Sequence, residues 1–430
     1  MNKGVCVKKI IVLILVSLVS LYAYDASIDI VKNSDKLPSI IVQDATNINF
    51  NSKKIEKKIF KLLIGDLKIS ANFIVDDSYV RTSYDGNFKN NFQSDKHVNL
   101  ILRFKLENDG NSLIGYMKLI NAKNGNIVTQ KIYKISNDRR YPFLAHKMII
   151  DANNAIGAPS IDWMQKFVIF SKITGKRKSD IVISDYTLSY QKTVVTGGLN
   201  IFPKWADDNQ DAFYYSSYNG RIPVLYRVNL DKGTRTKIIS SQGMLVCSDV
   251  SKDGTKLLLT MAPHDQPDVY LYNIKTKRKE RLTKFPGIDV SGNFIDNETR
   301  FAFVSDRLGY PNIFAKRFNI NAPVEQLVYQ GRNISSFSSY NNYIVFSRRE
   351  GDSEFGKNSF NLYLISTKTQ YIRQLTATGK NYFPRFANKG ETIMFIKNYK
   401  GQSALGIIRL YSNKSFLFPL KVGKIQSIDW

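Results

Sequence analysis

The chain has 430 residues, of which 43% are hydrophobic and 12% aromatic, and its formal net charge is +26. This length allows two or more domains with separate cores, and the many Tyr and Phe residues favour strands. The lysines are scattered, and no run reaches five like charges. The charge therefore indicates a solvated surface with a weak preference for acidic partners.

The first 23 residues predict a secretory signal peptide. Lys3, Lys8 and Lys9 precede the apolar run Ile10–Val16, and the stretch ends at Leu21-Tyr22-Ala23, with a small residue at the cleavage position. The run is too short and wrongly flanked for a membrane anchor, and a buried helix would need a polar face that the stretch lacks. Removing the signal leaves 59 basic and 36 acidic residues, or +23. Export makes nucleic acid an unexpected partner, and no later apolar stretch could span a bilayer.

Cysteine usage predicts an exported protein without an internal disulfide. Cys6 lies before the apolar run, so it is not the acylated cysteine of a lipoprotein, and it leaves with the signal. Cys247 is the one cysteine of the mature chain. We expect it to be packed in a strand rather than nucleophilic.

Residues 37–157 predict a small α/β domain, preceded by a polar and flexible segment at 24–36. Asn51 or Ser52 can cap a helix, since apolar residues follow at helical spacing. A second helix is expected over Tyr141–Ile156, ended by Gly157 and Pro159. The expected strands are LPSIIVQD, ANFIVDD and VNLILRFKL, followed by a hairpin of Leu113–Ile120 and Ile127–Ile135 around Asn124-Gly125.

After residue 158 the sequence repeats. The phrase SIDW occurs at Ser160–Trp163 and again at Ser427–Trp430, and five similar anchor positions lie between the two copies. The intervals between successive anchors are 42, 45, 44, 43, 49 and 44 residues. Such a period indicates a solenoid or a propeller. The anchors are Trp163, Trp205, Val250, Phe294, Phe337, Phe386 and Trp430.

The contents of each unit favour the propeller. The unit that starts at Trp205 continues with the β-rich runs AFYYSS, VLYRVNL and TKIIS, and the other units follow the same order. Four short strands in about 44 residues, without helical periodicity, are typical of a propeller blade. The predicted fold is thus an α/β N-terminal domain followed by an all-β six-bladed β-propeller over residues 158–430.

The duplicated phrase also predicts how the ring closes. The segment from Trp163 to Ser171 is three residues shorter than the segment from Trp205 to Ser216, and it lacks the turn of the other units. We expect the C-terminal strand 425–430, Ile425 to Trp430, to return and pair in the first blade, which leaves no open edge. The alternative is a frayed tail whose similarity is accidental.

No residue pattern predicts catalysis, a cofactor or a metal. His97, His146 and His264 are widely separated, which predicts surface or core residues rather than metal ligands. Asp207-x-Asn209-x-Asp211 resembles the start of a calcium loop, but Ala212 and Tyr218 stand where such a loop needs Gly and Glu. There is no G-x-S-x-G, and no hydrolase domain follows the repeats.

The order of signal, α/β domain and propeller resembles the TolB family, the periplasmic component of the Tol-Pal system. The resemblance covers the mature chain and rests on WADDN at Trp205, VSKDG at Val250, ISDY at Ile183–Tyr186 and the terminal SIDW. The turns at Phe294 and Phe337 depart from the family pattern. The resemblance implies a non-enzymatic periplasmic scaffold that supports outer-membrane integrity and invagination during cell division.

The resemblance also implies partners. These are the Pal lipoprotein, TolA, and other outer-membrane proteins near the peptidoglycan. TolA would bind the segment 24–36, whose strand-like core suits addition to a sheet edge or docking on the protein's own domains, although a disordered leader is the alternative. The residues expected to contact TolA are Asp25, Ile28, Asp29, Ile30 and Val31.

The partner surface for Pal is expected at one mouth of the propeller channel. Loops that lead into the innermost strands recur once per blade, so geometry gathers them at the same mouth. An aromatic and basic mixture there suits a protein interface. The candidate residues are Phe202, Met244, Phe285, Gly287, Gln330, Arg332, Lys380 and Tyr382, with Trp430 as the ring-closing residue. The alternative function is a propeller enzyme or glycan-binding protein acting on cell-wall material, which would need a cluster of carboxylates at one mouth.

Overall fold

The computed structural model describes residues 37–86, 98–329, 333–351, 359–369, 371–387, 389–399 and 401–430. Residues Lys36–Trp430 form one compact unit. The predicted signal peptide and the segment 24–36 lie outside the described residues. Within the described ranges, no helix combines the length and the apolar character needed to cross a membrane.

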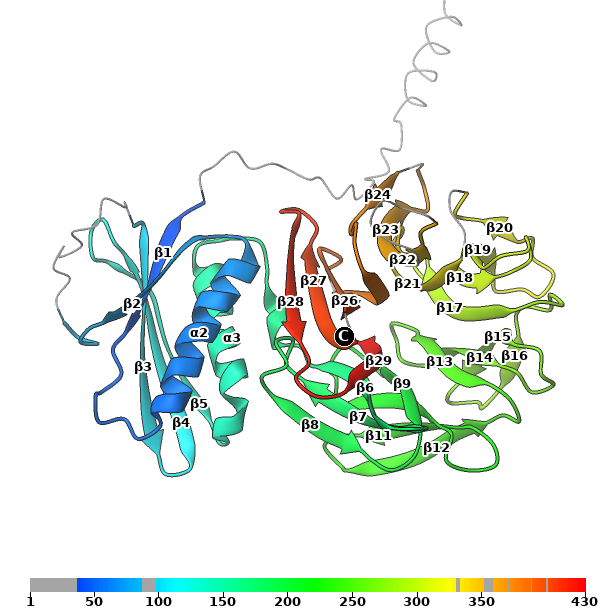
Figure 1. The fold of residues 1–430 in the computed structure, drawn as a ribbon, viewed down its shortest axis with the longest axis horizontal. Coiled ribbons are helices and arrows are strands. Elements are labelled where there is room, and N and C mark those ends of the chain that lie inside the picture. The colour runs from blue at the N-terminus through cyan, green and yellow to red at the C-terminus, as the bar shows by residue number, and fades with distance from the viewer. Residues whose placement is uncertain are drawn as a thin grey trace, which may run out of the picture. The chain divides into compact units, whose positions relative to one another are not determined.

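The N-terminal part is a five-stranded sheet in the order β2-β1-β3-β4-β5, with α2 and α3 on one face (Figure 1). Strand β1 pairs in parallel with β2 and β3, whereas β3, β4 and β5 pair antiparallel. The helices and strands predicted for this part are confirmed. Their bounds are β1 (Ser39–Asp44), α2 (Lys53–Ser70), β2 (Ile74–Arg81), β3 (Leu100–Asp109), β4 (Ser112–Asn121), β5 (Ile127–Ile135), a 3-10 turn (Asp138–Arg140) and α3 (Tyr141–Ala155).

Alternation in β4 explains how the helices pack on the sheet. Leu113, Met117 and Leu119 are buried and belong to the same apolar core as the inner faces of α2 and α3. Gly115 lies on this face, and a Cβ atom there would come within 2.4 Å of the Met148 side chain on α3. The glycine therefore allows a close approach of helix and sheet. Ser52 is the N-cap residue of α2, but its side chain makes no capping hydrogen bond.

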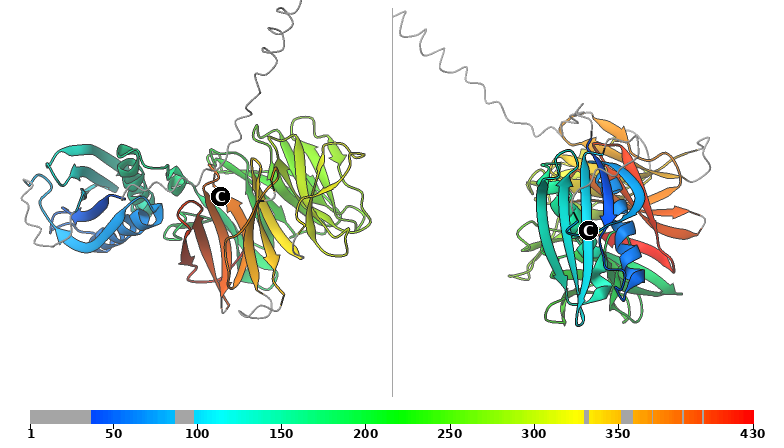
Figure 2. Two further views of the ribbon diagram at one scale, coloured as in Figure 1. Left: turned by 90° about the horizontal axis from the view of Figure 1, so that it is seen from above. Right: turned by 90° about the vertical axis from the view of Figure 1, so that its left-hand side faces the viewer.

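The second part consists of antiparallel sheets arranged around a common axis (Figure 1, with two further views in Figure 2). Four sheets have four strands each, and one has eight strands that form two consecutive four-stranded sets joined by a single parallel pair, Phe360 with Lys380. The strands are β6 (Val168–Gly175), β7 (Lys178–Ser184), β8 (Gln191–Val195), β9 (Asn200–Trp205), β10 (Ala212–Ser217), β11 (Val224–Asn229), β12 (Thr234–Ser240), β13 (Leu245–Val250), β14 (Lys256–Met261), β15 (Asp268–Asn273), β16 (Lys279–Arg281), β17 (Asp289–Ile295), β18 (Arg300–Ser305), β19 (Asn312–Arg317), β20 (Glu325–Gln326), β21 (Ile334–Tyr340), β22 (Tyr343–Arg349), β23 (Phe360–Ser366), β24 (Ile372–Gln374), β25 (Lys380–Phe386), β26 (Thr392–Tyr399), β27 (Gln402–Arg409), β28 (Lys414–Pro419) and β29 (Lys424–Asp429).

Six strands line the axis, and we call β9, β13, β17, β21, β25 and β29 the inner strands. Each inner strand lies next to the following one, and β29 lies next to β9, so the series returns to its start. The last strand pairs antiparallel with β6, from Lys424 opposite Ile173 to Asp429 opposite Ile169. One sheet, in the order β29-β6-β7-β8, thus combines the last strand of the chain with three strands from the beginning of the propeller.

The fifth anchor position is Ser339, two residues after the predicted Phe337. Val250, Phe294 and Phe386 pair with Leu257, Phe301 and Ile393, and the residue in the same relation to β22 is Ser339, opposite Ile344, rather than Phe337. A shift of two keeps a residue on the same face of a strand, and Phe337 is also buried, so the apolar pattern alone did not reveal the error. Trp163 lies in a 3-10 turn (Asp162–Gln165) rather than a strand.

Candidate functional site

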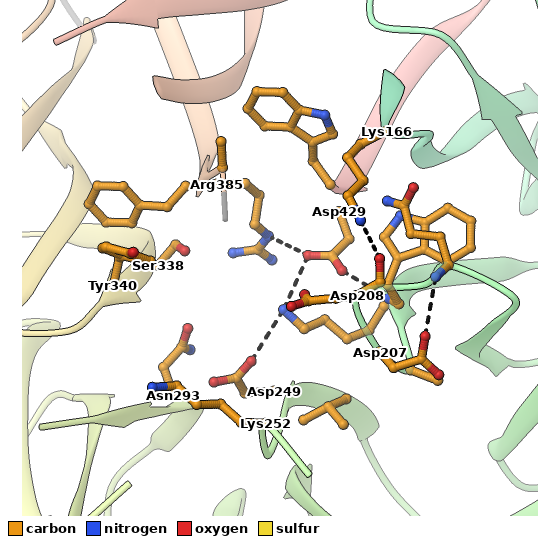
Figure 3. Close-up of a pocket in the computed structure, with 18 of the residues that line it drawn as sticks. Lys166, Asp207, Asp208, Asp249, Lys252, Asn293, Ser338, Tyr340, Arg385 and Asp429 are labelled. Carbon is orange, nitrogen blue, oxygen red and sulfur yellow. Dashed lines mark hydrogen bonds and ion pairs between the residues drawn. The ribbon is translucent and has the colours of Figure 1, made fainter. Parts of the chain in front are cut away.

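A ring of six polar side chains surrounds the axis where the inner strands end. Each inner strand contributes the residue immediately before its anchor position, and this residue points to the opposite side from the anchor because successive side chains alternate. All six line one pocket of about 530 Å³ (Figure 3). We call them the polar ring: Lys204, Asp249, Asn293, Ser338, Arg385 and Asp429.

Ion pairs connect four members of the polar ring. Lys204 Nζ lies 3.1 Å from Asp429 Oδ1 and 3.2 Å from Asp249 Oδ1, and Arg385 Nε lies 3.3 Å from Asp429 Oδ1. The two carboxylates also accept backbone N–H bonds from the neighbouring inner strands. Trp205 donates to Asp429 at 2.9 Å, and Phe294 donates to Asp249 at 3.0 Å. The ring therefore ties adjacent inner strands together.

The charges of the polar ring balance one another. Only 17% of the Lys204 side chain is exposed, and this burial would lower the pKa of its ammonium group. The carboxylates of Asp429 and Asp249 outweigh burial and raise that pKa above the ordinary lysine value. Lys204 and Arg385 thus remain cations, each paired with a carboxylate.

Four carboxylates line the pocket, those of Asp207, Asp208, Asp249 and Asp429, and Asp208 is exposed. Asp249 and Asp429 are paired within the ring, and Asp207 accepts backbone bonds from Asn209 and Gln210 in the turn after β9. The stretch that resembles the start of a calcium loop thus lies in the turn between β9 and β10. Within the described residues, no group of three or more His, Cys, Asp or Glu side chains could hold a metal ion.

The described residues predicted to bind Pal lie at the other end of the inner strands, where these strands begin. We call this the upstream end and the end with the polar ring the downstream end. Met244 precedes β13 and is exposed, whereas Phe202 and Tyr382 are half-buried in β9 and β25. The Phe202 ring lies 6.3 Å from that of Phe383, and its N–H donates to Ser427 Oγ. The remaining described candidates are Phe285 and Gly287 before β17 and Lys380 at the start of β25, while Gln330 and Arg332 lie outside the described residues.

Exposed apolar side chains gather at the upstream end. Antiparallel pairing places the loops between the second and third strands of each sheet at the same end as the loops that lead into the inner strands. Seven of the eleven exposed large hydrophobic residues of the described propeller lie there, with Val422 72% and Tyr329 78% exposed. The others are Ile173, Ile222, Met244, Leu308 and Tyr399.

Single-residue expectations for Cys247 and the histidines are partly confirmed. Cys247 is a buried free thiol, and burial raises its pKa well above the usual value. His146 is a core residue and His264 is exposed, whereas His97 lies outside the described residues. Trp430 packs edge-to-face on Trp163 with ring centroids 5.4 Å apart, so the two copies of the repeated phrase meet.

A buried polar cluster around His146 was not predicted. His146 Nδ1 lies 2.6 Å from Asp66 Oδ2, and its Nε2 lies 3.4 Å from Asp185 Oδ2, while the Tyr186 hydroxyl donates to Asp66 Oδ1. All four side chains are fully buried. The cluster joins α2 and α3 to the segment after β7, so the ISDY stretch of the sequence connects the α/β part to the propeller.

The fold and the polar ring define a β-propeller protein with an N-terminal α/β domain. Charged side chains that line the propeller axis pair with one another. The family model described as the TolB beta propeller domain matches residues 165–430. The Tol-Pal system protein TolB of Wolinella succinogenes is 48% identical to this chain, over 98% of this chain and 100% of its own length. The chain belongs to the TolB family.

Other relatives agree with this assignment. The Tol-Pal system protein TolB of Campylobacter jejuni subsp. jejuni is 46% identical, over 98% of this chain and 100% of its own length. A crystal structure of TolB from Acinetobacter baumannii matches with a TM-score of 0.72 at 18% identity, covering 92% of this chain and 97% of that one. This last likeness shows the shared fold.

Proposed function

We propose that the protein is a non-enzymatic periplasmic scaffold of the Tol-Pal system that binds Pal at the upstream end of the propeller. Seven of the eleven exposed large apolar side chains of the described propeller lie at that end, and this majority carries the proposal, because exposed apolar side chains supply contacts that a protein interface buries. Lys380 adds positive charge at the same end. Binding and release of Pal would regulate its attachment to the cell wall, which supports outer-membrane integrity and invagination during division.

The propeller has six blades in this proposal. The inner strands form a series of six that returns to its first member, which supports counting the eight-stranded sheet as two blades. The C-terminal strand then completes the first blade. Sequestration of edges within a ring protects the strands from pairing with other chains.

The absence of enzymatic activity is also part of the proposal. A glycan-cleaving propeller would need a carboxylate that remains free to donate or accept a proton at its pocket. The carboxylates of the polar ring instead neutralise Lys204 and Arg385 and accept backbone bonds. They are better suited to hold the inner strands in place.

Charge reversal at Arg332 and Lys380 tests the Pal surface. The double variant R332E/K380E should bind purified Pal about tenfold more weakly at low salt and with a smaller deficit at high salt, because electrostatic steering is screened. Surface plasmon resonance at two ionic strengths measures both effects. The matched control is K166E/K252E at the downstream end, which changes the charge equally. If this control loses affinity while R332E/K380E binds normally, the Pal surface lies at the downstream end instead.

Truncation of the N-terminal segment tests the proposed TolA site. We expect a chain without residues 24–35 to lose TolA binding and to retain the melting temperature of the mature protein, because the described fold begins after this segment. Calorimetric titration with the TolA C-terminal domain measures binding, and circular dichroism measures unfolding. Retained TolA affinity in the truncated chain would refute the assignment and leave the Pal proposal untouched.

A further inference from the structure

A groove between α2 and the edge strand β2 lies apart from the propeller. It encloses about 590 Å³. The Phe60 and Tyr79 rings form its floor, packed edge-to-face with centroids 5.0 Å apart, and Ile64 continues the apolar surface along α2. Tyr79 remains 52% exposed. The floor is therefore an apolar surface that a side chain from another molecule can reach.

Two of the three acidic residues that line the groove are buried and have partners within the chain. Glu56 pairs with Lys53 at 3.0 Å and with Arg81 at 2.9 Å. Asp44 is fully buried and accepts the Tyr79 hydroxyl at 2.9 Å. Because these carboxylates already have donors, the groove has no need of a bound cation.

Two lysines at the rim of the groove have no acidic partner among the described residues, and the exposed carboxylate that also lines it, Asp77, pairs with Lys68 at 2.7 Å. Lys57 and Lys61 are exposed, one helical turn apart on α2, and neither forms an ion pair with any residue that the structure describes. Helix α2 has six lysines and two acidic residues, and the acids Glu56 and Asp66 are buried in contacts of their own. A ligand that complements this groove would carry an apolar group for the floor and negative charge for Lys57 and Lys61.

We propose that this groove binds an acidic segment of a partner protein that places an apolar side chain on the Phe60–Tyr79 floor. Carboxylates of the segment would pair with Lys57 and Lys61, which lie beside the floor. A protein segment fits better than an anionic lipid surface, because the apolar contact lies inside a groove and calls for a single projecting side chain. This site goes beyond the proposed binding of Pal and TolA.

A peptide probe and paired helix variants test the site. The probe is a labelled twelve-residue peptide in which Asp and Glu alternate with Leu and Phe, and fluorescence anisotropy measures its binding to the mature protein. The variant Lys57→Gln/Lys61→Gln should weaken binding about tenfold at low salt. The matched control Lys54→Gln/Lys58→Gln removes the same charge from the same helix outside the groove and should bind like the unaltered protein.

Three results would overturn the proposal. Equal losses in both variant pairs would mean that the peptide responds only to the overall charge of α2. No measurable binding of the acidic peptide would exclude the ligand class. Capture of the protein by phosphatidylglycerol vesicles, dependent on Lys57 and Lys61 while the peptide fails, would assign the groove to a lipid surface.

Discussion

Deletion of Lys424–Trp430 should lower the free energy of unfolding of the propeller by several kcal/mol. The deletion removes the ladder that β29 forms with β6 and the fully buried Ile428 side chain. It also removes Asp429, which leaves the partly buried cations Lys204 and Arg385 without their shared partner. Chemical denaturation followed by tryptophan fluorescence and circular dichroism measures the loss.

A matched variant distinguishes the effect of losing strand β29 from the effect of changing exposed side chains in the same segment. Lys421→Ala/Lys424→Ala changes exposed side chains of the same segment and should leave the denaturation midpoint nearly unchanged. Adding a synthetic peptide of residues 421–430 to the truncated chain should restore part of the lost stability. An unaltered melting temperature after the deletion would show that β29 is not needed to close the ring.

The second large effect is expected from His146. Replacement by Ala leaves the buried carboxylates of Asp66 and Asp185 without a cation, which should cost about 3–5 kcal/mol. Burial of the imidazole would lower its pKa, but the two carboxylates outweigh burial and raise the pKa to about 9 from the ordinary 6.5. The folded protein therefore binds a proton more tightly at this site than the unfolded chain does.

This difference predicts a loss of stability in alkaline solution. The contribution of His146 is fully present below pH 6.5 and disappears as the pH rises through about 9. The loss should reach about 3 kcal/mol. Urea denaturation at intervals of pH should show this decline in the unaltered protein and not in His146→Ala. His264→Ala removes an exposed histidine as the control, and the decline should persist there; a decline that also persists in His146→Ala would disprove the linkage.

Local and periodic features of the fold were predictable from the sequence. Helix and strand periodicity revealed α2, α3 and the propeller strands, since each pattern depends on neighbouring residues. The period near 44 residues and the repeated phrase indicated that the last strand returns to the first blade, and β29 does pair with β6. The sequence predicted Phe337 instead of Ser339 because residues two apart lie on the same face of a strand. An alternating pattern of apolar residues therefore fits both positions equally well.

The polar contacts were not predictable in the same way. Lys204 and Asp429 are 225 residues apart, and Asp66 and Tyr186 are 120 apart, so no local pattern connects them. One signal was available, since the residue before each correctly placed anchor is polar: lysine, aspartate, asparagine, serine, arginine and aspartate in turn. With the fifth anchor placed at Ser339 instead of Phe337, the repeat itself identifies the polar ring.

The pairing of β29 with β6 sets an order of events during biosynthesis. The ribosome makes β6, β7 and β8 early, but their sheet lacks its inner strand until residues Lys424–Asp429 have been made. Every other inner strand precedes the strands of its own sheet and can pair as soon as they emerge. The ring thus stays open until β29 has been made, and a chain that lacks β29 keeps β6 as an exposed edge available to other chains.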